Sequence, residues 1–275
     1  MAVVSALYVY PLKSARGVAL DLVELDDRGP RADRRWMVVD DQGKVLSQRR
    51  VRAIALIAPS LASEGLVLAA PGMPALAVRQ PEDAPGAGAI EGHVYGGSCR
   101  VLVASAAANA WLTRFLGVSA RLVFQPESTV LTMSPNFAGA LQTPRRIALT
   151  DGSPLLLIGQ ASLDDLNRRL EAPVSMNRFR PNIVVQGTAP YEEDDWESIA
   201  IGAVKFEVSK ACSRCAATTI DQATGQQGVE PLRTLATYRK AESGVNFGQN
   251  LSHHGPGVIR VGDRVRPSNQ LAAER

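Results

Sequence analysis

Alternating apolar and polar residues run through most of the first 125 residues and predict β-strands. The clearest runs are rich in Val, Leu and Tyr, and glycine, proline or aspartate separates them. The segment from Arg34 to Arg50 carries Asp41-Gln42-Gly43 between two apolar runs, which predicts a hairpin turn. Residues 81–92 are rich in proline and glycine and predict a loop. The other strands expected here are residues 4–12, 17–25, 66–70, 75–80, 93–105 and 120–125.

Two segments have the spacing of amphipathic helices. Residues 105–117 begin with Ser105, a suitable N-cap, and end at Gly117, a suitable residue after a helix. A second helix is expected over residues 162–170, where Ser162 is followed three positions later by Asp165 in a weak capping-box pattern. The apolar stripe of this second helix consists of Leu163, Leu166 and Leu170.

The second half of the chain returns to strand patterns, expected over residues 181–187, 199–211, 217–221 and 257–267. Strands do not alternate regularly with helices, so a doubly wound sheet is a poor match. We therefore expect a mixed α+β, β-rich fold of two β-barrel-like domains with a few helices. The expected divisions are a first barrel domain at 1–125, a linker or mobile loop at 126–146, a second barrel domain at 147–268 and a polar tail at 269–275.

The composition narrows the class of protein. Hydrophobic residues make up 45% of the 275 residues, which is enough for a real core. A net charge of +3 and an aromatic content of 5% argue against nucleic acid as a partner. There is no run of about 18 apolar residues and no signal-peptide pattern, so we expect no membrane partner. Three cysteines favour a reducing compartment, and we expect a cytoplasmic protein.

The pair Cys212 and Cys215, in C-x-x-C spacing, is the most specific chemical feature, and four interpretations compete for it. Structural zinc needs about four nitrogen or sulfur ligands. A redox-active pair normally begins a helix, whereas the following Ala-Ala-Thr-Thr-Ile looks like a strand. Buried structural cysteines are common. The possible further zinc ligands, none in a second close pair, are Cys99, His93, His253 and His254.

The fourth interpretation is that one thiolate binds a soft transition metal. Arg214 lies between the two cysteines and Lys210 lies just before them, and their positive charge favours a thiolate. This argument supports a metal ligand without choosing the metal.

Several polar residues at expected strand ends suit an anionic ligand. Arginine and lysine, together with hydroxyls and backbone amides, bind phosphate through charge-assisted hydrogen bonds. Taken singly, each is more often a solvated surface residue, but together they suit a protein that holds a phosphorylated, anionic cofactor. They are Lys13, Ser14, Arg34, Asp151, Gly152, Ser153, Arg178, Arg180 and Asn182.

The chain resembles the MOSC proteins, in particular the branch that includes the mitochondrial amidoxime reducing component and its bacterial relatives. The resemblance covers almost the whole chain, as an N-terminal MOSC β-barrel domain followed by the MOSC domain. Its most specific part is the combination of FRPN at residues 179–182 with ACSRC and TT from residue 211. Further matching segments are YPLKS, DRRW, DGSPLLLIGQASLDDLN, DDWESIAIG, EPLRTLATYR, NFGQN and VGD.

The resemblance implies a molybdenum cofactor, molybdopterin in its monopterin form without a nucleotide, held between two β-rich domains. By position, Cys215 would be the protein ligand to molybdenum, Cys212 a structural neighbour, and Asp151 a candidate for orienting substrate or passing a proton. The residues that would line the cofactor pocket and hold the pterin and its phosphate are Lys13, Ser14, Arg34, Asp151, Gly152, Ser153, Arg180, Asn182, Ser213, Arg214 and Cys215.

The chain departs from the family pattern at Ala32, where relatives often carry arginine, and at Gln222 and Ala223, which could alter the pocket rim. It also lacks the cysteines for a [2Fe–2S] cluster, which needs about four. We therefore expect a separate electron-donor protein of the flavin reductase, ferredoxin or cytochrome type.

Three functions follow. The first is molybdenum-dependent reduction of N-hydroxylated small molecules such as amidoximes, hydroxylamines and N-hydroxylated bases. The second, also proposed for MOSC domains, is a sulfur carrier with a persulfide on Cys215. The third is a non-catalytic binding module with a structural thiol pair, in which Cys215→Ala would act like the wild type.

Overall fold

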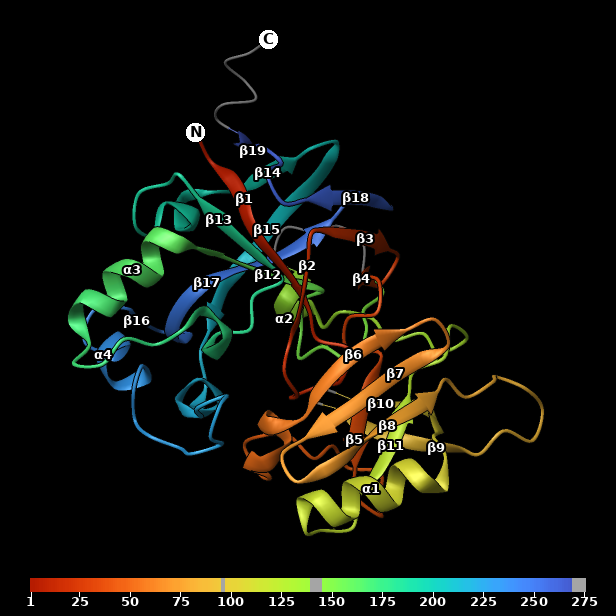
Figure 1. The fold of residues 1–275 in the computed structure, drawn as a ribbon. Helices are drawn as coiled ribbons and strands as arrows, with labels where there is room; N and C mark the ends of the chain where they lie inside the picture. The colour runs from red at the N-terminus through yellow and green to blue at the C-terminus, as the bar shows by residue number, and fades with distance from the viewer. Residues whose placement is uncertain (95–96, 139–144, 269–275) are drawn as a thin grey trace.

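The computed structural model describes residues 1–94, 97–138 and 145–268, and it shows two β-rich lobes with few helices (Figure 1). This confirms the expected mixed α+β, β-rich class. The larger lobe is built on a nine-stranded sheet in the order β19-β14-β15-β17-β12-β13-β1-β2, with β16 paired to β17. Its strands are β1 (Val3–Val9), β2 (Val18–Leu20), β12 (Leu155–Gly159), β13 (Ile183–Gln186), β14 (Ser198–Ile201), β15 (Val204–Ser213), β16 (Lys240–Ala241), β17 (Gly244–His253) and β19 (Val265–Pro267).

Two further groups of elements complete the larger lobe. A three-stranded sheet shares its core and consists of β3 (Leu22–Asp26), β4 (Gly29–Pro30) and β18 (Gly257–Arg260). The helices of this part of the chain are α2 (Pro135–Ala138), α3 (Gln160–Arg169), α4 (Leu232–Ala236) and the 3₁₀ helices η2 (Met176–Arg178), η3 (Glu192–Asp195) and η4 (Ala216–Thr219).

The smaller lobe contains a four-stranded and a three-stranded sheet around one core with Trp36, Leu68 and Trp111. Helix α1 packs on β11 and covers the outer end of this lobe (Figure 1). The elements of the lobe are β5 (Trp36–Val39), the 3₁₀ helix η1 (Arg52–Leu56), β6 (Ala58–Ala62), β7 (Gly65–Ala70), β8 (Met73–Arg79), β9 (Ala89–Val94), β10 (Gly97–Val103), α1 (Ala106–Leu116) and β11 (Arg121–Phe124).

Chain order and spatial order differ at the N-terminus. Strand β1 pairs antiparallel with β13, so the chain starts in the larger lobe, crosses to the smaller one at β5 and returns after β11. No helix in the described part of the chain is long and apolar enough to cross a membrane. The linker expected at 126–146 lies partly outside the described residues, and the polar tail expected at 269–275 lies wholly outside them. The proposed domain divisions stay predictions.

Helix α1 forms as the sequence predicts. The Ser105 hydroxyl accepts a hydrogen bond from the Ala108 backbone N–H, and Gly117 adopts a left-handed φ of 68°. The hairpin turn is also confirmed, because the Asp40 N–H donates to the Lys44 carbonyl and Gly43 has a φ of 75°. The strand expected at 17–25 breaks at Asp21 into β2 and β3.

The start expected for the second helix is wrong. Helix α3 begins at Gln160 after Gly159, so Ser162 lies inside it rather than capping it. The Ser162 hydroxyl instead donates to the buried carboxylate of Glu193, which also accepts the Gly159 N–H at 2.9 Å. A carboxylate more than 30 residues away thus accepts the hydrogen bonds at the start of this helix, and no local sequence pattern could predict that contact.

The strand expected at 217–221 is also wrong, because residues 216–219 form the 3₁₀ helix η4. Threonine usually favours strands, but here its hydroxyls bond to nearby backbone. Thr218 donates to the Cys215 carbonyl at 3.0 Å and Thr219 to the Ala216 carbonyl at 2.8 Å. Such local bonds offer the backbone an alternative to strand pairing.

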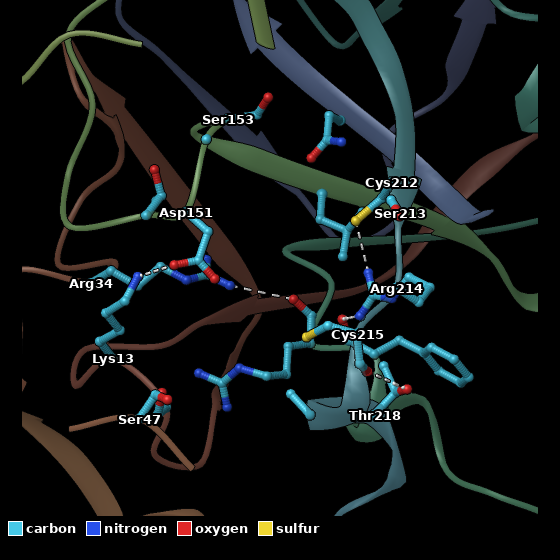
Figure 2. A pocket seen from close by; sticks show the side chains of 18 of the residues that line it. Lys13, Arg34, Ser47, Asp151, Ser153, Cys212, Ser213, Arg214, Cys215 and Thr218 are labelled. Carbon is cyan, nitrogen blue, oxygen red and sulfur yellow. Dashed lines mark hydrogen bonds and ion pairs between the residues drawn. The ribbon is translucent and has the colours of Figure 1, made fainter. Parts of the chain in front are cut away.

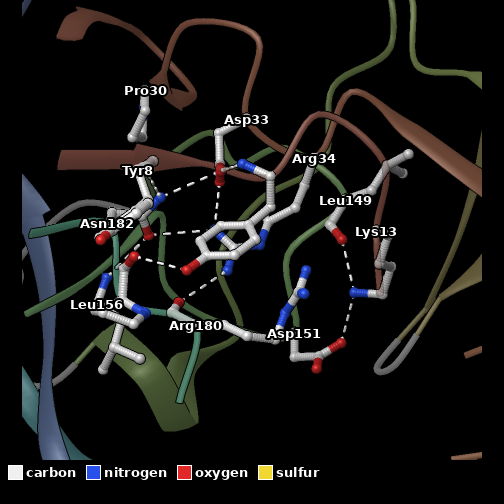
Figure 3. Close-up of polar contacts among 12 residues, drawn as sticks. Tyr8, Lys13, Pro30, Asp33, Arg34, Leu149, Asp151, Leu156, Arg180 and Asn182 are labelled. Carbon is white, nitrogen blue, oxygen red and sulfur yellow. Dashed lines mark hydrogen bonds and ion pairs between the residues drawn. The ribbon is translucent and has the colours of Figure 1, made fainter. Parts of the chain in front are cut away.

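A buried polar cluster around Asp33 joins loops that are distant in sequence (Figure 3). The Asp33 side chain is 1% exposed. It accepts hydrogen bonds from the Tyr10 N–H at 2.7 Å and the Asn182 amide at 3.1 Å, and it pairs with the Arg34 guanidinium. The Asn182 side-chain oxygen in turn accepts from Arg34 at 3.1 Å and from the Leu156 N–H at 3.2 Å. The cluster thereby fixes residues 33–34 against residues 180–182.

We predict that Asp33→Asn lowers the free energy of unfolding by about 3–5 kcal/mol, because the change leaves the buried Arg34 charge without its carboxylate. Urea unfolding measures the loss. The matched control is Glu24→Gln, which removes a carboxylate from an exposed pair with Arg31 at 2.7 Å and should cost less than about 1 kcal/mol. Equal losses in both variants would contradict the role given to Asp33.

Candidate functional site

A cavity of about 260 Å³ lies where loops of the two lobes meet (Figure 2). The structure brings every residue predicted for the cofactor to its wall: Lys13, Ser14, Arg34, Asp151, Gly152, Ser153, Arg180, Asn182, Ser213, Arg214 and Cys215. These residues come from five separate stretches of chain. The structure places them together, and the role of each stays a prediction.

The two cysteines have different surroundings at the cavity wall. The Arg214 guanidinium donates to the Cys212 sulfur at 2.9 Å and to the Phe179 carbonyl at 2.6 Å, so its charge is directed at Cys212. Cys215 is exposed, and no described side chain hydrogen-bonds its thiol. Of the two sulfurs, the Cys215 thiol is therefore the one left for a ligand.

Irregular strand pairing sets the direction of this segment. The register between β15 and β17 shifts twice, between Val208 and Lys210 and again between Ala211 and Ser213. Such bulges bend a strand and re-aim its side chains. Strand β15 then ends at Ser213, and η4 begins directly after Cys215. The two cysteines thus lie on either side of the junction between a bulged strand and a short helix.

Lys13 and Asp151 form an ion pair on another wall of the cavity (Figure 2). The buried Lys13 ammonium donates to the Asp151 carboxylate at 2.6 Å and to the Leu149 carbonyl at 2.7 Å. The charge of Lys13, with its hydrogen bond and the charges of Arg49 and Arg34, lowers the pKa of Asp151 to about 2. Asp151 is therefore a carboxylate at neutral pH.

Arg34 and Arg180 are two cations of the cavity lining, and both have a left-handed backbone conformation. Their φ angles are 47° and 58°, in a region that non-glycine residues adopt uncommonly. Both guanidiniums lie over the ring of Tyr10, at 4.6 Å and 4.2 Å from its centroid. Tyr10 is itself buried, and its hydroxyl donates to the Pro181 carbonyl at 3.0 Å. The ring thus fixes the two cations close together.

The two arginines differ in their counter-charge. Arg34 pairs with Asp33, whereas Arg180 donates to the Ala15 carbonyl and has no carboxylate within 4 Å in the described part of the chain. Burial and the neighbouring charge of Arg34 lower the pKa of Arg180 to about 10, so it remains a cation at neutral pH. A half-buried cation at a cavity wall without a carboxylate partner suits an anionic ligand.

Gly152 and Ser153 lie where α2 approaches the cavity. A Cβ atom at Gly152 would come within 2.3 Å of the Phe137 ring, so this position has no room for a side chain while Phe137 stays in place. The Ser153 hydroxyl lies 3.3 Å from that of Ser209. Lys210, on β15, donates to the Asn136 carbonyl at 3.0 Å, and its ammonium lies 4.4 Å from the centre of the Phe137 ring.

Sequence reasoning missed several residues of the site. Asp33 and Tyr10 act through contacts with residues 149 and 171 positions away, which no local motif displays. Arg49 and Phe137 line the cavity from segments without an identified motif. Arg178 was expected and also lines the cavity, but it pairs with Asp221 at 3.0 Å. Gln222, expected at the rim, is instead buried and donates to the Gln48 side chain at 3.1 Å.

The described residues include no group of three or more His, Cys, Asp or Glu side chains that could hold a metal ion. The zinc interpretation of Cys212 and Cys215 therefore lacks the further ligands that a structural zinc site needs. A metal at Cys215 would have to bring most of its other ligands with it, as a metal bound to an organic cofactor does.

The wall also offers hydrogen-bonding groups that the protein itself leaves unused. The Thr150 hydroxyl and the Arg214 Nε are buried and have no hydrogen-bond partner. Buried polar atoms are normally paired, so such atoms at a cavity wall suit a polar ligand. Together with the unpaired Arg180 and the exposed Cys215, they fit a negatively charged cofactor that carries its own metal.

Comparison with known families matches both parts of the chain. Residues 1–119 match the MOSC N-terminal beta barrel domain and residues 144–266 match the MOSC domain. The boundaries of the matched ranges do not coincide with the two lobes. Strand β1 lies in the first matched range but pairs with β13 in the larger lobe.

Curated relatives are similar over nearly the whole chain. Mitochondrial amidoxime-reducing component 1 is 34% identical both in Mus musculus and in Homo sapiens, over 95% of this chain and 81% and 82% of those proteins. Molybdenum cofactor sulfurase of Homo sapiens is 30% identical over 96% of this chain, which spans 32% of that protein. Among solved structures, the YuaD protein of Bacillus subtilis matches 96% of this chain and 94% of its own, with a TM-score of 0.43 and 11% identity.

The resemblance read from the FRPN and ACSRC segments is therefore confirmed by matches that extend over both lobes. The chain belongs to the MOSC family, in the group that contains the mitochondrial amidoxime-reducing components.

Proposed function

We propose that this protein is a molybdenum cofactor-dependent reductase of N-hydroxylated compounds. The observation that carries the proposal is the cavity lined both by the exposed Cys215 thiol and by Arg180, a half-buried cation without a carboxylate partner among the described residues. The names of the amidoxime-reducing relatives support the reaction class. The expected cytoplasmic location stays a prediction.

Different residues of the cavity wall would bind the metal and the phosphate of the cofactor. Cys215 would supply the protein's sulfur ligand to molybdenum, and the pterin dithiolene would supply others. Arg180 and Arg34 would bind the phosphate of the monopterin cofactor, because charge-assisted hydrogen bonds to phosphate are strong. The unpartnered Thr150 hydroxyl and Arg214 Nε would donate to the cofactor's polar atoms. Lys13, Ser14, Gly152, Ser153, Asn182 and Ser213 would complete the wall.

The bound cofactor would supply the two-electron chemistry of the overall change R–NHOH + 2 e⁻ + 2 H⁺ → R–NH₂ + H₂O. The N–O bond breaks, nitrogen is reduced and the oxygen leaves as water. The protein supplies binding, orientation and electrostatics. The electrons would come from a separate protein of the flavin reductase, ferredoxin or cytochrome type. The three cysteines of these 275 residues are fewer than the about four that a [2Fe–2S] cluster needs.

Asp151 suits substrate orientation better than proton donation. Its pKa of about 2 keeps it ionised at neutral pH, so it accepts hydrogen bonds and does not release a proton there. Its carboxylate is exposed to the cavity, and the ion pair with Lys13 holds it in position. An N–OH or amidine N–H group of the substrate could donate to it.

A sulfur carrier is the second candidate, and the exposure of Cys215 favours it, because a persulfide needs an accessible thiol. The similarity to a molybdenum cofactor sulfurase points the same way. Arg180 weighs against it, since a carrier with a bare persulfide has no need of an unpaired cation in the lining of the same cavity.

We predict that protein purified from a host able to make the cofactor contains about one equivalent each of molybdenum and pterin, measured by mass spectrometry. Cys215→Ser should lose most of the metal, because the protein's only sulfur ligand is gone. Cys212→Ser is the matched control and should retain it, since the Cys212 sulfur is engaged by Arg214. No molybdenum in the wild type, together with sulfane sulfur on Cys215, would support the carrier instead.

A second prediction concerns pH. The pKa of Asp151 lies below its ordinary value of 3.8, so its carboxylate stays ionised from about pH 5 to pH 8 and adds no step to the pH profile there. Asp151→Asn should therefore lower kcat/KM by about 100-fold at every pH in this range, through lost orientation, without moving the profile. A profile that loses an ionisation in the variant would instead identify Asp151 as a proton donor. Asp164→Asn, on the surface of α3, is the control.

A further inference from the structure

The described wall of the cavity carries more positive charge than its own carboxylates balance. Seven cationic side chains line it, against the single carboxylate of Asp151. Three of the cations are committed to ion pairs: Lys13 with Asp151, Arg34 with Asp33, and Arg178 with Asp221. Arg180 and Arg214 are part of the proposed cofactor site, and Lys210 is bonded to the α2 segment. Arg49 is left without an assigned partner.

Arg49 differs from the cofactor cations in its surroundings. It is exposed at the cavity wall and makes no hydrogen bond, ion pair or ring contact with the described residues, apart from the effect of its charge on Asp151. Lys13 and Arg180 are instead held by backbone carbonyls. Cations that backbone carbonyls hold in place suit a cofactor that stays bound, whereas an exposed cation without such contacts suits a molecule that enters and leaves.

The backbone that carries Arg49 is nevertheless fixed. The Ser47 carbonyl accepts the N–H groups of Arg50 and Val51, both at 2.9 Å, in a tight turn before η1. Gln48, next to Arg49, is buried and bonds to Gln222. The turn therefore presents Arg49 to the cavity from a defined place. Arg50, the next residue, pairs with Asp40 at 3.7 Å and does not line the cavity.

We propose that Arg49 binds an anionic group, a carboxylate or a phosphate, on the substrate, and that the protein prefers N-hydroxylated compounds that carry such a group. The inference rests on the proposed function, because it concerns the substrate of the same cavity. A cleft lined by one sign of charge concentrates ligands of the opposite sign, and a guanidinium binds carboxylate or phosphate through paired hydrogen bonds. Asp151, the lone carboxylate of the described lining, would meet the N-hydroxylated end of the same molecule.

The test compares benzamidoxime with its para-carboxy and para-phosphonooxy derivatives on the holoprotein. Reduced methyl viologen serves as the electron source, so that docking of a donor protein does not enter. Arg49→Ala should raise KM for the charged compounds about 10-fold or more, leave their kcat unchanged and leave KM for benzamidoxime unchanged. Arg50→Ala is the matched control and should change none of these values. The derivative with the larger effect identifies carboxylate or phosphate as the preferred group.

Calorimetric binding gives a readout independent of turnover. Para-carboxybenzamidine should bind Arg49→Ala holoprotein about 10-fold more weakly than wild type, while benzamidine binds both equally, and added salt should narrow the difference. Equal effects on charged and neutral compounds, equal effects of Arg49→Ala and Arg50→Ala, or loss of pterin from Arg49→Ala would overturn the proposal. Wild-type holoprotein that reduces none of the compounds would instead overturn the proposed function, and the binding data would still decide the role of Arg49.

Discussion

The carboxylate of Asp33 is the group on which the geometry of the cavity depends. It neutralises Arg34 and receives hydrogen bonds from Tyr10 and Asn182, so loops from the start and the middle of the chain meet at one buried charge. Arg34 and Arg180 both lie over the Tyr10 ring, and burial together with the charge of Arg34 lowers the pKa of Arg180. Removing one partner of a desolvated ion pair leaves an uncompensated charge, so Asp33 is needed to keep Arg34 in place, while the Tyr10 ring contacts both guanidiniums.

The groups that line the resulting cavity differ in how far they are exposed, and we expect their roles to differ in the same way. Fixed cations and unused hydrogen-bonding groups form one part of the wall, suited to a phosphorylated cofactor that stays bound. The exposed Cys215 thiol is left for the metal of that cofactor, and the exposed Arg49 can meet substrates that enter and leave. Asp151 combines the two properties. Its carboxylate is held in place by Lys13, as the cofactor-binding groups are, but it also faces the open cavity.

Much of this site can be predicted from sequence, because its residues sit in short motifs at strand ends. The family resemblance that these motifs carry assigns Lys13, Arg180 and Cys215 to one pocket, and the structure brings all three to the lining of one cavity. The parts that could not be predicted depend on distant contacts. Asp33 acts on Asn182 and Glu193 acts on α3 across long stretches of chain. The threonines after Cys215 look like a strand until their hydroxyls are seen to bond to backbone.

X-ray absorption at the molybdenum edge of the purified protein tests the central claim most directly, because it reports the atoms bound to the metal. The account predicts a molybdenum centre whose sulfur shell loses one sulfur in Cys215→Ser and is unchanged in Cys212→Ser. A sulfur shell that is the same in wild type and Cys215→Ser would contradict it, because the metal would then be held without the thiol that the cavity presents.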